Sequence, residues 1–211
     1  VHTATAAEVF GMTPDSVTSD QRRMAKAINF GIAYGISGFG LSQQIGSTPA
    51  EADAYIQRYF ARYPGVREYV RRTVEQARRT GYVSTLLGRR RYLTDLHSRN
   101  RVVREAAERV AINTPIQGSQ ADLIKLAMIR IHREVLPRFP GALMILQVHD
   151  ELVFELDPDQ ARPLGYQVAE VMANTLPLSV PVQVELRVGP NWNDLEHLGT
   201  VSSTVPAAGG A

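Results

Sequence analysis

The chain has 211 residues, of which 44% are hydrophobic and 21% are charged, a balance typical of a folded domain rather than a disordered chain. It has no cysteine, which excludes disulfides, thiolate metal sites and cysteine nucleophiles. It also has no apolar run near the roughly 18 residues that a membrane-spanning helix needs. The net charge of +2 conceals an asymmetry, because residues 58–109 carry fourteen Arg and five acids, whereas residues 141–211 carry two Arg and nine acids.

Helical patterns dominate the first two thirds of the chain. Residues 48–51, Thr-Pro-Ala-Glu, form a helix-start signature, and Thr18 or Ser19 can cap an earlier helix. We expect Pro115 to interrupt a long helical stretch. The expected helices cover about residues 3–10, 18–34, 40–44, 48–63, 66–79, 99–113 and 117–136.

The last third adds β-structure. After an earlier hairpin around Gly88, the expected elements are a hairpin over residues 143–156 with acids at its turn, a helix over 158–176 and a half-buried strand over 182–188. Residues 200–211 are small and polar, so we expect a disordered tail there. The predicted fold class is α+β, mainly helical at first and with antiparallel strands later.

One expected helix carries a stripe of four residues spaced four apart, namely Arg22, Lys26, Phe30 and Tyr34. Cations can hold a triphosphate, and aromatic rings can stack on a sugar and a base. Their order along the helix therefore suits a bound nucleotide. The alternative is that Phe30 and Tyr34 belong to the core, with the two cations on a solvated face.

His149, Asp150 and Glu151 lie between two apolar strand-like runs. Adjacent acids held rigidly in such a turn are stabilised by a divalent cation, and Mg²⁺ prefers oxygen ligands. Asp150 is the better candidate ligand. The alternative is a solvated acidic turn.

A second series with the same spacing consists of Arg109, Asn113 and Gln117. Side chains of these types bond to base edges and to sugar-phosphate oxygens, although an ordinary helix surface has the same pattern. The arginines of residues 58–109 suit phosphate oxygens in the same way, or form a solvated face of mixed charge.

These groups occur together, in the same order, in one family. Residues 20–35 resemble motif B of family A DNA polymerases, and Gln147-Val148-His149-Asp150-Glu151 resembles their motif C; residues 2–11 and 106–118 match as well. The resemblance covers about residues 1–198 and is strongest to the bacterial polymerase I group. It implies a fingers subdomain at 1–98 and the C-terminal part of a palm subdomain at 99–199.

The resemblance also implies residue roles. The implied dNTP-binding residues are His2, Arg22, Lys26, Phe30 and Tyr34, with Tyr34 beside the template position. The implied residues that hold primer–template DNA are Arg109, Asn113, Gln117 and His149. The implied catalytic residues are Lys26, Asp150 and Glu151, with Asp150 as a metal ligand.

The implied function is template-directed DNA polymerisation, in which a dNTP is joined to a primer 3′-OH by a two-metal mechanism with Mg²⁺, or alternatively Mn²⁺. The family holds its metals with one Asp in motif C and another in motif A, and no motif A string occurs here. We therefore expect a C-terminal fragment of a longer polymerase that does not extend a primer alone. The expected partners are primer–template DNA and dNTPs, with no membrane and no obligate protein partner, in the nucleoid-associated cytoplasm of a bacterium.

Two other functions remain open. A catalytically dead DNA-binding module would keep the arginine-rich block and would not depend on Asp150. A metal-dependent phosphodiesterase would use His149, Asp150 and Glu151, but no further His or Asp cluster accompanies these three residues.

Overall fold

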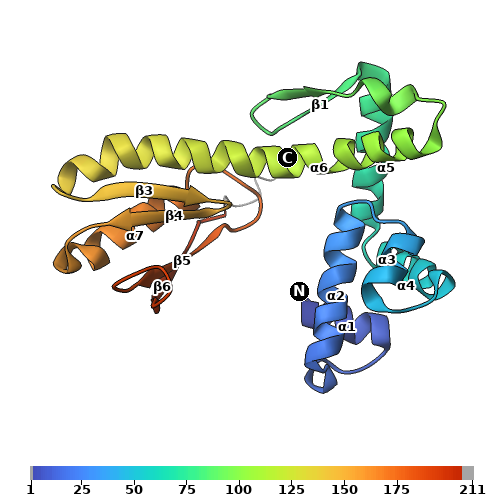
Figure 1. The fold of residues 1–211 in the computed structure, drawn as a ribbon, viewed down its shortest axis with the longest axis horizontal. Helices are drawn as coiled ribbons and strands as arrows, with labels where there is room; N and C mark the ends of the chain where they lie inside the picture. Colours follow the sequence, from blue (N-terminus) through green and yellow to red (C-terminus); the bar gives the residue numbers. More distant parts are fainter. Residues whose placement is uncertain (1, 206–211) are drawn as a thin grey trace. The chain divides into compact units, whose positions relative to one another are not determined.

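The computed structural model describes residues 2–205 (Figure 1). By its internal contacts the chain divides into two compact units, Val1–Ser119 and Gln120–Ala211. The predicted subdomain boundary at residues 98/99 is a functional division, and it stays a prediction. The α+β fold class is confirmed, because helices predominate and three antiparallel hairpin pairs accompany them.

The first unit is mainly helical. Its elements are α1 (His2–Phe10), η1 (Pro14–Ser16), α2 (Ser19–Ala33), α3 (Gly38–Ile45), α4 (Pro49–Arg62), α5 (Pro64–Thr80), β1 (Tyr82–Ser84), β2 (Arg90–Tyr92), η2 (Thr94–His97) and the first part of α6 (Arg101–Arg130). The helix starts that the sequence predicts at Thr18 and Thr48 are confirmed. Each threonine accepts a bond from the backbone N–H three residues on, and that residue's side chain accepts from the threonine N–H at 2.9 Å.

Two apolar clusters hold this unit together. One cluster joins the four helices α1, α2, α3 and α4 around the fully buried Ile28, Leu41 and Ala52. The other joins α5, the β1–β2 hairpin and α6 around Ala77, Leu96 and other residues. The first cluster fixes which face of α2 turns inward, and the second anchors the N-terminal half of α6.

The prediction that Pro115 interrupts the helix is wrong, because α6 runs from Arg101 to Arg130 with Pro115 inside it. Proline has no N–H and leaves a carbonyl one turn earlier without its usual donor, at a cost of about 3 kcal/mol. The carbonyl without its donor is that of Ala111; one residue on, the Tyr69 hydroxyl of α5 donates to the Ile112 carbonyl at 3.0 Å and ties this part of α6 to α5. Burial of Ala107 and Ala111 in the apolar cluster also favours the continuous helix.

The second unit packs a helix against short antiparallel strands. It contains the end of α6, a π-turn η3 (Ile131–Val135), η4 (Leu136–Arg138), β3 (Leu143–Val148), β4 (Glu151–Glu155), η5 (Pro158–Gln160), α7 (Ala161–Ala173), β5 (Gln183–Val188) and β6 (Glu196–Ser202). One face of α7 buries Leu164 and Val168 with Ile131, and Ala169 and Ala173 pack against β5 and β6.

The β3–β4 hairpin is irregular, and β6 differs from the prediction. The β3–β4 register shifts between Met144 and Leu146, which leaves Ile145 as an extra, exposed residue. The sequence did not predict β6, and the expected tail begins too early, since Thr200 pairs with Glu185 inside β6. Within the predicted tail, residues 206–211 lie outside the described residues.

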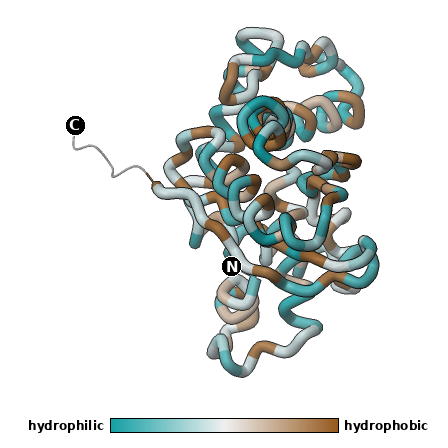
Figure 2. Tube along the Cα trace, turned by 90° about the vertical axis from the view of Figure 1, so that its left-hand side faces the viewer, coloured by the Kyte–Doolittle hydropathy of each residue, from teal (hydrophilic) through white to brown (hydrophobic). Residues whose placement is uncertain are grey.

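Hydrophobic and hydrophilic residues alternate over short distances along the trace (Figure 2). Within residues 2–205, no helix is long and apolar enough to cross a membrane.

Candidate functional site

The stripe predicted on residues 22–34 lies on the outward face of α2. The opposite face buries Ala25, Ile28 and Ile32, which lie between the stripe residues along the sequence. Phe30 is 44% exposed and Tyr34, which caps the helix, is 41% exposed. The alternative that these two rings belong to the core is therefore wrong.

The side chains of the stripe are ordered along the helix. Lys26 Nζ lies 5.9 Å from the centre of the Phe30 ring, and the Phe30 and Tyr34 rings are nearly parallel, 15° apart, with centroids 6.1 Å apart. Arg23 pairs with Asp20 at 2.9 Å. By contrast, neither Arg22 nor Lys26 pairs with a carboxylate among the described residues, so both cations are available to an anionic ligand.

His2 joins this face from α1. Its ring centroid lies 5.6 Å from that of Phe30, at an interplanar angle of 46°. Asn29 places its amide nitrogen 3.0 Å from His2 Nδ1 and 3.1 Å from Thr5 Oγ1. Burial lowers the pKa of His2, and the positive charges of the chain's N-terminus, Arg22 and Lys26 lower it further, which favours the neutral ring.

Sequence reasoning missed Asn29 and Thr5. The available signal was the position of Asn29 directly before Phe30, at the border between the buried and exposed faces of α2. A polar residue at such a border commonly bonds to the element packed against it.

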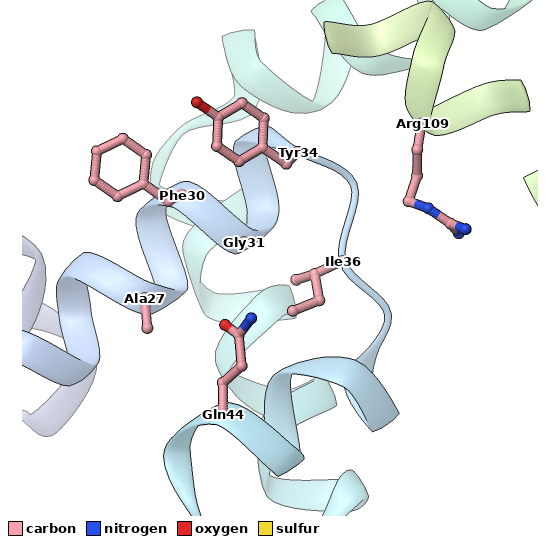
Figure 3. A pocket seen from close by; sticks show the side chains of 7 residues that line it. All are labelled: Ala27, Phe30, Gly31, Tyr34, Ile36, Gln44 and Arg109. Carbon is pink, nitrogen blue, oxygen red and sulfur yellow. The ribbon is translucent and has the colours of Figure 1, made fainter. Parts of the chain in front are cut away.

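An open pocket of about 270 Å³ borders the stripe (Figure 3). Its lining comes from α2, α3 and α6: Ala27, Phe30, Gly31, Tyr34, Ile36, Gln44 and Arg109. Gly35 has φ 72°, and a Cβ there would lie 3.2 Å from Arg109 Cγ, so this glycine allows α6 to approach the end of α2. The structure therefore brings the predicted DNA-binding residue Arg109 to the predicted dNTP-binding face.

The other two residues of the Arg109 series do not line this pocket. Gln117 is exposed on α6. Asn113 is half-buried, and its side-chain oxygen has no hydrogen-bond partner among the described residues.

The acidic turn belongs to the second unit. His149 and Asp150 form a two-residue turn between β3 and β4, because Val148 pairs directly with Glu151. His149 has φ 51°, which is rare for a residue with a side chain, and Gln147 Nε2 donates to the His149 carbonyl at 2.7 Å. All three predicted residues, His149, Asp150 and Glu151, are exposed.

The carboxylates of this turn can supply oxygen ligands to Mg²⁺, with Asp150 held at the tip. Across residues 2–205 no three His, Cys, Asp or Glu side chains gather into a metal-binding group. Mg²⁺ commonly binds through one or two carboxylates, substrate phosphates and water, so the turn fits as part of a metal site rather than as a complete one.

Comparison with known proteins shows the family of the chain. The model of DNA polymerase family A matches residues 1–194, and the chain belongs to this family. It is 52% identical to a DNA polymerase I of Pseudomonas aeruginosa over 194 residues, which are 92% of this chain and 21% of that protein. It is 51% identical to a thermostable DNA polymerase I of Thermus filiformis over 192 residues, which are 91% of this chain and 23% of that one.

A solved structure is also similar. The polymerase domain of Pol1 from M. smegmatis, in complex with DNA primer-template and dNTP, matches with a TM-score of 0.81 and 43% identity. The match covers 95% of this chain and 33% of that one. The chain thus spans about a fifth of the length of the curated relatives that it matches.

Proposed function

We propose that the chain is part of a template-directed DNA polymerase, which adds dNTPs to a primer 3′-OH. In this proposal residues 1–98 act as fingers and residues 99–199 as the C-terminal part of the palm. The proposal combines family membership with the chemistry of the two exposed sites.

The observation that carries the proposal is the ordered face of α2. Two cations that pair with no carboxylate of residues 2–205 precede two half-exposed, nearly parallel rings, and His2, whose pKa is lowered, lies against the first ring. A triphosphate can bond to Arg22 and Lys26, while the sugar and base lie on Phe30 and Tyr34. The positive charge of Lys26 can also stabilise the negative charge that develops on the leaving pyrophosphate.

Primer–template DNA is the proposed second ligand. Arg109, Asn113, Gln117 and His149 present donors suited to sugar-phosphate oxygens and base edges. Several arginines of residues 58–109 are exposed, and phosphate neutralisation by such side chains supplies much of the affinity for DNA.

Asp150, with Glu151 beside it, is proposed to hold a divalent cation, either Mg²⁺ or Mn²⁺. Two such ions, when bound, activate the primer hydroxyl and stabilise the leaving pyrophosphate. Because the family holds its metals with a second Asp in motif A, and no such string occurs in these 211 residues, we propose that the chain alone does not extend a primer.

A chimera tests the proposal. This chain would replace the matching segment of the Pseudomonas aeruginosa relative, and steady-state primer extension would be measured. Lys26→Ala is expected to lower kcat/KM for dNTP about a hundredfold, the effect of losing a charged hydrogen bond of roughly 1.5–3 kcal/mol. Arg23→Ala is the matched control, since Arg23 pairs with Asp20, and it should leave kcat/KM nearly unchanged.

The test also distinguishes the DNA-binding alternative. A chimera that binds DNA in a salt-sensitive way, incorporates no dNTP and is indifferent to Asp150→Ala would contradict the polymerase proposal and support a catalytically dead binding module.

A further inference from the structure

Asn29 links α1 to α2 directly behind the nucleotide-binding face. Its amide nitrogen lies within hydrogen-bond distance of two groups on α1, His2 Nδ1 and Thr5 Oγ1. Thr5 is 2% exposed, and its hydroxyl also lies 3.2 Å from Asn29 Oδ1. The Asn29 side chain is therefore fixed from both ends, on the residue next to Phe30.

The direction of the bond to His2 determines the state of the imidazole. An amide nitrogen only donates, so Nδ1 must accept with its lone pair. In a neutral ring the proton then lies on Nε2, which becomes a donor. A third positive charge beside those of Arg22 and Lys26 is disfavoured, which agrees with the lowered pKa of His2.

We propose that Asn29 is a positioning residue that holds His2 as the Nε2–H tautomer, so that the ring offers one neutral donor to the phosphates of a nucleotide bound along α2. This inference rests on the proposed function, because it names a determinant of the same site. The contact of His2 with Phe30 at 5.6 Å keeps the donor beside the ring on which the sugar lies.

Nuclear magnetic resonance of nitrogen-15-labelled histidine in the 211-residue chain tests the tautomer without any nucleotide. The His2 signals are assigned by their loss in His2→Ala. Nδ1 should show the shift of an unprotonated nitrogen and Nε2 that of a protonated one. Asn29→Asp is nearly isosteric but only accepts, so it should move the proton to Nδ1 and raise the pKa of His2. Asn193→Asp, in the β5–β6 loop, is the control and should change neither.

A protonated Nδ1 in the wild-type chain would overturn the inference, as would an unchanged His2 in Asn29→Asp. Thr5→Val gives a second test that adds no charge. It removes the hydroxyl that fixes the amide, so it should populate both tautomers, and an unchanged tautomer would count against the inference.

Kinetics of the chimera tests the consequence. Asn29→Asp should lower kcat/KM for dNTP about tenfold, equivalent to about 1.4 kcal/mol. In a His2→Ala background it should cause no further loss, and full additivity of the two losses would overturn the inference. A chimera that incorporates no nucleotide at all would instead overturn the proposed function, while the resonance experiment decides the tautomer in either case.

Discussion

The Tyr69 hydroxyl of α5 donates to the Ile112 carbonyl of α6 at 3.0 Å, three residues before the proline inside that helix. The same stretch of α6 carries Arg109, which lines the pocket beside the stripe, and the half-buried Asn113. A single side-chain bond thus ties α5 to this part of α6, one residue from Ala111, whose carbonyl loses its backbone donor because of Pro115.

Tyr69→Phe should therefore destabilise the chain by about 1 kcal/mol, since it removes one hydrogen bond and keeps the ring. Urea unfolding measures the difference. Tyr92→Phe is the matched control, because Tyr92 is exposed and its hydroxyl forms no hydrogen bond with the described residues. Equal midpoints for the two variants would contradict a supporting role for Tyr69.

The turn that presents Asp150 is strained at His149. A side chain at φ 51° costs about 1–2 kcal/mol, and a β-branched residue tolerates this conformation least. His149→Val should therefore be at least about 1 kcal/mol less stable than His149→Gly. Chemical denaturation of both variants checks this, and equal stability would show that the turn relaxes without strain.

The pH dependence of stability should reflect the lowered pKa of His2. Below the ordinary value of 6.5 the unfolded chain binds a proton that the folded chain does not yet bind. Stability should then fall as the pH drops from about 6.5 to the lower folded pKa. His2→Gln removes this contribution, so the difference between wild type and variant should shrink over that window. A difference independent of pH would contradict the assignment.

Phe30 should also affect sugar selection. The resemblance of residues 20–35 to motif B of family A DNA polymerases implies that phenylalanine at this position gives a preference for deoxynucleotides over dideoxynucleotides. The half-exposed ring is accessible to the sugar of a bound nucleotide. Competition between the two substrates in the chimera measures the preference. Equal incorporation would refute the prediction.

Local signals in the sequence predicted most of the fold. The helix starts at Thr18 and Thr48 were correct because the capping groups lie within three residues of each other. Pro115 misled the prediction because tertiary contacts hold the helix around it, namely the burial of Ala107 and Ala111 and the bond from Tyr69, 46 positions earlier, which no local pattern reveals. Strand β6 was missed because its last residues, from Thr200, are small and polar and were expected to begin a disordered tail. Its pairing with β5 is a tertiary effect.

The candidate site was predicted in the same uneven way. Spacing alone placed Arg22, Lys26, Phe30 and Tyr34 on one face, and it left open whether the rings were buried. Only the packing of α1, α3 and α4 against α2 decides that question. Asn29 was not singled out because its side-chain contacts are with two residues of another helix, His2 and Thr5.

Primer extension that depends on Mg²⁺ tests the central claim most directly. In the chimera, Asp150→Ala should reduce extension at least about a thousandfold, because a lost metal ligand removes several kcal/mol of charge stabilisation. Asp157→Ala, an exposed acid just beyond β4, is the control and should extend normally. The 211-residue chain alone should extend nothing. Equal extension by the Asp150 and Asp157 variants would contradict the claim that this turn holds a catalytic metal.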